Sequence, residues 1–188
     1  MKHSAAALER VPARITAIGV IGFALALAVA SQIAIPIPGT PVPFTFTPLV
    51  VVLAGLWLGP RAGAASMTLY LVLGATGLPV FAPMGPPGLA RLVGPTAGYL
   101  YAYPLAAFVA GLGANRARTV AGRFLAALAG TAVILLGGFA WLAVLGGSLA
   151  SAMTFGIHPF ILLDALKALL AAVIAPSRNP ASSDRAPA

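Results

Sequence analysis

The sequence predicts an all-α membrane protein with six transmembrane helices and both termini in the cytoplasm. Its mean hydropathy is +1.01, and only 7% of its 188 residues are charged, whereas soluble domains carry roughly 25%. The apolar residues gather in segments, most of them about as long as a bilayer requires. Basic residues occupy alternate gaps between these segments, as the positive-inside rule expects of cytoplasmic loops.

The apolar segments predict one membrane domain, residues 15–175. The first helix is expected at Ile15–Ile35, close to the roughly 20 residues of a span, although its basic start and A-V-A-S site also resemble a cleaved signal peptide. The proline-rich "PIPGTPVPFTFTP" that follows predicts a structured loop. The other five helices are expected at Leu49–Leu58, Ala62–Val80, Thr96–Leu112, Phe124–Leu149 and Pro159–Ile174.

The basic residues support the second helix, which is short for a span. Without it, Arg61 and the basic cluster after the fourth helix would lie on opposite sides of the membrane. The segment 1–14 is expected to be cytoplasmic, and 176–188 a disordered cytoplasmic tail. Only Arg91 falls in an expected outer loop. The basic residues on the expected cytoplasmic side are Lys2, Arg10, Arg14, Arg61, Arg116, Arg118, Arg123, Arg178 and Arg185.

The residue inventory argues against several classes of function. The net charge of +8 comes from scattered residues, not from the basic patch of a nucleic-acid-binding protein. No G-x-x-x-x-G-K-[ST] loop is present to bind ATP phosphates. Cysteines are absent, and the histidines are only His3 and His158, which is too few for a familiar hydrolase or metal site. We therefore expect neither enzyme activity nor a cofactor.

The segment "HPFILLDALKALL", residues 158–170, contains an acid and a base, Asp164 and Lys167, in an apolar run. Because they are three residues apart, they share a helix face and can pair. In a helix starting at Pro159 they would lie about 8 and 12 Å from its outer end. They could form a polar pocket floor open to the outside, a structural pair that pins the helix, or a proton relay through Asp164.

Arg91 belongs to the glycine- and proline-rich segment "FAPMGPPGLARLVGPTAGYL". Such loops can close over a ligand, although a single arginine in a solvated loop is also common. With the acid and base deeper in the membrane, Arg91 indicates a ligand that carries a carboxylate near the mouth and hydrogen-bonding groups below it. Tyr99 and Tyr103 share a face of the fourth helix and could be interfacial anchors or ligand-packing residues.

Four stretches, in this order, resemble the BioY family, the biotin-specific substrate-binding subunits of energy-coupling factor (ECF) transporters. They are "IPIPGTPVPFTF", "LVVVLAGLWLGPRAGAASMTLYLVLGATGLPVF", "GPTAGYL" and "HPFILLDALKALL", within about residues 13–172. Two positions depart from the family's usual pattern. Thr47 stands where Gln is frequent, which could alter a polar contact near the site, and Ala97 stands where Gly is frequent.

The resemblance implies a biotin cavity that opens outward under the loop between the third and fourth helices. The biotin ureido group would meet Asp164 and Lys167, its carboxylate would meet Arg91, and its ring would pack on Phe81 and Tyr99.

The resemblance also implies partners, namely a transmembrane coupling protein and two ATPase subunits. Small residues of the first helix, Ala24 and Ala28, would dock on the coupling protein. Some members of the family occur without a dedicated coupling module, so transport by the chain alone or as an oligomer stays open. Two interpretations compete with this one: a subunit for another small vitamin, and a structural membrane protein without a ligand.

Overall fold

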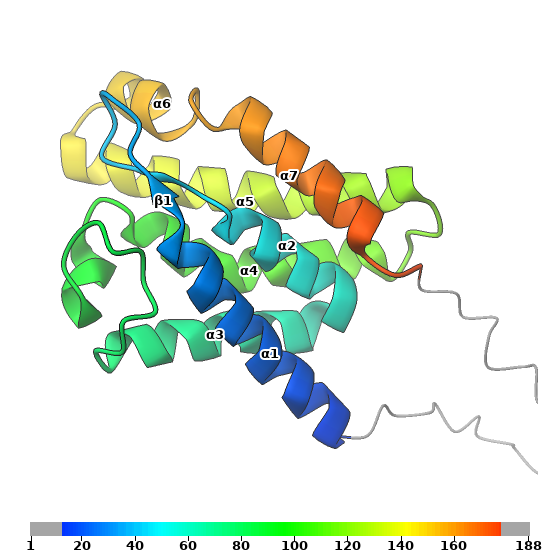
Figure 1. The fold of residues 1–188 in the computed structure, drawn as a ribbon. Helices are drawn as coiled ribbons and strands as arrows, with labels where there is room; N and C mark the ends of the chain where they lie inside the picture. Colours follow the sequence, from blue (N-terminus) through cyan, green and yellow to red (C-terminus); the bar gives the residue numbers. More distant parts are fainter. Residues whose placement is uncertain (1–12, 178–188) are drawn as a thin grey trace, which may run out of the picture.

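The apolar segments form helices in the computed structural model, which describes residues 13–177 (Figure 1). Two short strands, β1 (Ala34–Ile35) and β2 (Phe44–Thr45), pair antiparallel, and a 3-10 helix, η1 (Gly88–Val93), precedes α4. The expected N-terminal segment up to residue 12 and the C-terminal tail from residue 178 lie outside the described residues. The α-helices are α1 (Ala13–Gln32), α2 (Thr47–Leu58), α3 (Pro60–Ala75), α4 (Ala97–Ala114), α5 (Val120–Gly146), α6 (Leu149–Gly156) and α7 (Ile161–Ile174).

The helix α6 was not predicted from the sequence. The expected fifth helix continued to Leu149, but α5 ends at Gly146, and Gly147 then adopts a left-handed backbone conformation with φ of 61°. Ser148 caps the next helix, because its hydroxyl accepts a hydrogen bond from the backbone N–H of Ser151. The break therefore comes from a glycine and a capping residue inside an apolar run, where hydropathy alone shows no boundary.

The helices differ in their capacity to cross a membrane. Within residues 13–177, α4 and α5 are long and apolar enough for a span, and α6 and α7 together form a third candidate that is bent by 50°. The part Thr16–Gln32 of α1 and the helix α2 are shorter apolar helical segments. Counting α6 and α7 as one broken span is compatible with the six predicted spans, a number that stays a prediction.

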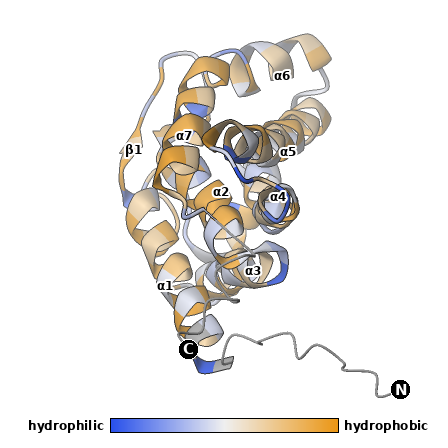
Figure 2. Ribbon diagram, turned by 90° about the vertical axis from the view of Figure 1, so that its right-hand side faces the viewer, coloured by the Kyte–Doolittle hydropathy of each residue, from blue (hydrophilic) through white to orange (hydrophobic). Residues whose placement is uncertain are grey.

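The outer surface of the bundle is apolar. Large hydrophobic side chains are exposed along the helices, including Ile18 (70%), Val144 (79%) and Leu162 (72%). Figure 2 shows hydrophobic positions on the outward faces of α1 and α7. A surface of this kind is expected where lipid, not water, surrounds the helices.

Small residues bring the central helices into close contact. The helix α4 packs on α2, α3 and α5, and its neighbours carry glycines where the backbones meet. A Cβ on Gly55 of α2 would lie 2.2 Å from the carbonyl oxygen of Ala107 in α4, and one on Gly130 of α5 would lie 2.8 Å from that of Ala106. These contacts set the spacing of the helices around the site.

Gly55→Ala is therefore expected to destabilise the fold by about 1–3 kcal/mol, as overpacking in a core does. The thermal unfolding midpoint of the purified protein in lipid nanodiscs would measure the loss. Gly22→Ala in α1 is the matched control, because a Cβ there meets nothing within 4 Å. Equal unfolding midpoints for the two variants would contradict the close approach of α2 and α4.

The structure shows how the expected docking residues on α1 are placed in the chain, whereas docking itself stays a prediction. Ala24 is buried in the core of its own chain beside Leu27, and Ala28 is partly buried against the same core. These two residues therefore pack inward. The small residues of α1 that the structure describes as exposed are Ala17, Gly22 and Ala26.

The ends of the helices divide the molecule into two sides. The start of α1, the end of α7 and the α2–α3 and α4–α5 connections lie at one end, at the right of Figure 1. The strand pair, η1 and α6 lie at the other. The exposed arginines near the first end are Arg14, Arg61, Arg116 and Arg118.

Candidate functional site

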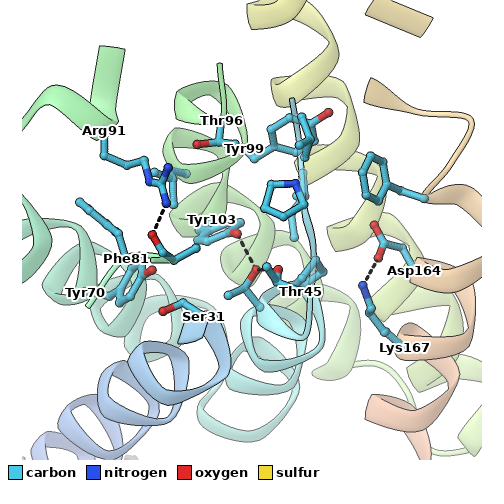
Figure 3. Close-up of a pocket in the computed structure, with 18 residues that line it drawn as sticks. Ser31, Thr45, Tyr70, Phe81, Arg91, Thr96, Tyr99, Tyr103, Asp164 and Lys167 are labelled. Atoms are coloured by element: carbon cyan, nitrogen blue, oxygen red, sulfur yellow. Dashed lines mark hydrogen bonds and ion pairs between the residues drawn. The ribbon is translucent and has the colours of Figure 1, made fainter. Parts of the chain in front are cut away.

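A cavity lies at the end that carries the strand pair and η1. The space between its lining atoms, open mouth included, is about 650 Å³. Figure 3 shows Arg91 at one side of this cavity, Asp164 and Lys167 at the other, and Tyr103 between them. The polar or aromatic residues that line it are Ser31, Thr45, Thr47, Tyr70, Phe81, Arg91, Thr96, Tyr99, Tyr103, Phe160, Asp164 and Lys167.

Asp164 and Lys167 form a buried ion pair at the cavity wall. Lys167 Nζ donates to Asp164 Oδ1 at 2.6 Å, and both side chains are less than 8% exposed. Because α7 begins at Ile161 and not at the predicted Pro159, Asp164 lies in its first turn. The pair is therefore about 3 Å closer to the end of the helix than expected. It still presents one acceptor group and one donor group to the cavity.

Arg91 is buried, so the interpretation as a stray residue in a solvated loop is wrong. It is 6% exposed and lines the cavity. Its guanidinium donates to the carbonyl oxygens of Ala82 and Met84 in the α3–η1 loop. Burial lowers its pKa from the ordinary value, which lies so far above neutrality that the side chain keeps its charge. Arg91 thus brings a cation to the cavity while it braces the loop.

A chain of three hydroxyls lies in the middle of the cavity. Thr45 and Thr47 approach each other at 2.6 Å, and Thr47 and Tyr103 approach at 2.8 Å. Three hydroxyls carry three protons and use two of them between themselves, so one donor is left for another group. These hydrogen bonds explain why the hydroxyls of Tyr103 and Thr47 can be buried, with the two residues only 5% and 4% exposed.

Tyr103→Phe is expected to reduce the free energy of unfolding by about 1 kcal/mol, because one buried hydrogen bond is lost. Tyr101→Phe is the control on the same helix, since the ring of Tyr101 is exposed and its hydroxyl bonds the Leu92 carbonyl oxygen in a less buried setting. Thermal unfolding would compare the two variants. A larger loss for Tyr101→Phe would contradict the buried hydroxyl chain.

Aromatic side chains form the apolar walls of the cavity. Phe81 packs edge-on against Tyr70, with ring centroids 5.4 Å apart. Tyr99 lies across the cavity, and its hydroxyl donates to the carbonyl oxygen of Gly156 at 2.7 Å. Tyr99 and Tyr103 are both buried. Their interpretation as interfacial anchors is therefore wrong, and the alternative, packing at the cavity, is the one the geometry allows.

The end of α1 holds the loop that carries Phe81. Ser31 Oγ lies 2.5 Å from the carbonyl oxygen of Val80. Gln32 Nε2 donates to the carbonyl oxygens of Phe81 at 3.1 Å and Pro79 at 3.3 Å. The wall containing Phe81 is thus attached to α1 as well as to Arg91.

The cavity brings together seven residues singled out in the sequence. They are Thr47, Phe81, Arg91, Tyr99, Tyr103, Asp164 and Lys167. The polar or aromatic lining residues that the sequence did not single out are Ser31, Thr45, Tyr70, Thr96 and Phe160. All of these except Ser31 had a usable signal, since each lies in one of the four stretches that resemble the BioY family. Within residues 13–177 no three His, Asp or Glu side chains lie close enough to hold a metal ion.

The arrangement can be compared with known proteins. The model of the BioY family matches residues 3–184. This chain belongs to the BioY family. Among BioY relatives, the probable biotin transporter of Pyrococcus horikoshii is 43% identical over 153 residues, covering 81% of this chain and 89% of the relative. The biotin transporter of Thermotoga maritima is 39% identical over 141 residues, covering 75% and 83%.

A solved structure has a similar fold. It is the S-component for biotin from an ECF-type ABC transporter, with a TM-score of 0.79 and 26% identity, covering 87% of this chain and 89% of that one. The named BioY relatives are transporters, not enzymes. With its apolar helices and lipid-type surface, this member of the BioY family is a multi-pass protein of the cell membrane.

Proposed function

We propose that the chain is the biotin-binding substrate component of an ECF transporter. The observation that carries the proposal is the polarity of the cavity, with a buried acid–base pair on one side and an arginine on the other. Biotin has a ureido group with two N–H donors and a carbonyl acceptor at one end, and a carboxylate at the other. The sequence similarity to named biotin transporters supports the same ligand.

Each polar group of biotin has a partner in the proposed complex. The Asp164 carboxylate accepts from a ureido N–H, and the Lys167 ammonium donates to the ureido oxygen. Arg91 donates to the carboxylate with the guanidinium N–H groups that Ala82 and Met84 leave free. The fused rings pack between Phe81 and Tyr99, and the free proton of the Thr45–Thr47–Tyr103 chain faces the centre of the ligand.

In the proposed assembly, import depends on partners. A transmembrane coupling protein and two ATPase subunits would supply the energy, because the chain has no ATP-binding loop. We propose six spans with α6 and α7 as one bent span, and an orientation with the arginine-rich end in the cytoplasm. The cavity then opens to the outside.

Equilibrium binding tests the ligand. The protein in lipid nanodiscs is expected to bind biotin, and neither thiamine nor riboflavin should compete. Tighter binding of thiamine or riboflavin would show that the protein is specific for another vitamin. If none of the three vitamins binds, the interpretation as a structural membrane protein would be favoured. Labelled biotin uptake, compared between cells with and without a coupling module, tests the partners. Equal uptake in both would contradict their requirement.

A further inference from the structure

Phe44 is a neighbour of the site that does not line the cavity. It lies on β2, where it pairs with Ile35 of β1. Side chains alternate across a strand, and the next residue, Thr45, belongs to the cavity wall. Phe44 is therefore directed away from the cavity, and its ring reaches Lys167 of α7 from the loop between α1 and α2.

The ring of Phe44 lies against the ammonium that the proposed function uses. Lys167 Nζ is 3.9 Å from the ring centroid and 2.6 Å from Asp164 Oδ1. An ammonium has three donors, and these two neighbours fix its position from two directions. The lysine stem is flexible, and its head is a compact point charge, so without the ring only the carboxylate would hold the head in place.

The loop that leads to Phe44 is also attached to α6. Thr40 Oγ1 donates to the carbonyl oxygen of Phe155 in α6 at 2.7 Å. The Phe44 ring is itself held by Phe46, edge-on with centroids 5.5 Å apart. The ring is thus fixed by its strand, its loop and an aromatic neighbour. A cation near the face of a fixed and partly buried ring is attracted by the ring quadrupole.

We propose that Phe44 is a positioning residue for ligand recognition. Through a cation–π contact it holds the Lys167 ammonium beside Asp164, with a remaining N–H directed to the ligand. This role rests on the proposed function of the site, and it makes the electron density of the Phe44 ring a determinant of affinity, although Phe44 itself touches no ligand.

A graded series of aromatic rings tests the proposal. Mono-, di- and trifluorinated phenylalanine at position 44 progressively weakens the negative potential of the ring face and changes its shape little. The logarithm of the Kd for biotin, measured by calorimetry in nanodiscs, is expected to rise step by step along this series. Phe44→Leu should raise Kd roughly 2- to 30-fold, and Phe44→Tyr should retain most of the affinity.

The same fluorinated series at position 46 is the matched control, because Phe46 contacts the Phe44 ring and the ammonium of Lys167 lies over the Phe44 ring. Equal Kd values along the series at position 44, or an equally steep rise along the series at position 46, would overturn the proposal, because packing alone would then explain the loss. Wild-type protein that binds no biotin would overturn the proposed function and this inference together. If the wild type binds biotin and the Kd does not change along the fluorinated series at position 44, only this inference would be overturned.

Discussion

Asp164→Asn is expected to raise the Kd for biotin by at least about 30-fold. The substitution leaves the Lys167 ammonium buried without its carboxylate partner, and truncating one member of a buried charge pair typically costs about 2–5 kcal/mol. It also replaces the proposed acceptor for a ureido N–H. Calorimetric titration with biotin measures the effect, and a Kd within threefold of the wild type would contradict the role of Asp164.

A double substitution separates ligand binding from a purely structural ion pair. Replacing both charges together, as Asp164→Leu with Lys167→Met, leaves no unpaired buried charge, and such replacements are often neutral for stability. The double variant is expected to unfold near the wild-type temperature and still fail to bind biotin. Wild-type affinity in this variant would show that the pair only pins α7 to its neighbours.

Arg91→Gln is expected to lower the affinity for biotin about 10- to 100-fold, since a hydrogen bond to a charged group contributes about 1.5–3 kcal/mol. Biotin amide, which has no carboxylate, should lose little affinity. The comparison of the two ligands matters because Arg91 also bonds the carbonyl oxygens of Ala82 and Met84. If Arg91→Gln acted only by loosening that loop, the affinities for biotin and biotin amide would fall by the same factor.

Two further variants sharpen the test of Arg91. Arg91→Lys keeps the charge but loses the planar fork of donors, so it should recover only part of the affinity for biotin. Arg61→Gln is the control, an exposed arginine at the opposite end of the molecule, and it should bind both ligands like the wild type. An equal loss for biotin and biotin amide in Arg91→Gln would contradict the carboxylate contact.

The polar part of the site was predictable because charges are rare in this chain. Asp164, Lys167 and Arg91 stand out from apolar or glycine-rich surroundings, where an ionisable residue is costly and needs a reason. The hydropathy pattern predicted most of the helices on the same principle. It misplaced the end of α5 and omitted α6, because Gly147 and Ser148 interrupt a run that remains apolar on both sides.

The apolar and hydroxyl-bearing walls were harder to predict, because they arise from contacts between distant segments. The sequence pattern of Tyr99 and Tyr103 fits interfacial anchors as well as ligand-packing residues. Only the packing of α4 against its neighbours buries both rings at the cavity. Ser31 carries no local signal. Ser31 and Tyr70 reach the site only because α1 and α3 pack beside the loop that carries Phe81.

A structure of the protein with biotin bound, in a nanodisc, tests the central claim most directly. The ureido group is expected within hydrogen-bond distance of Asp164 and Lys167, the carboxylate beside Arg91, and the fused rings between Phe81 and Tyr99. Biotin bound outside this cavity, or with its carboxylate beside Asp164, would contradict the proposed site.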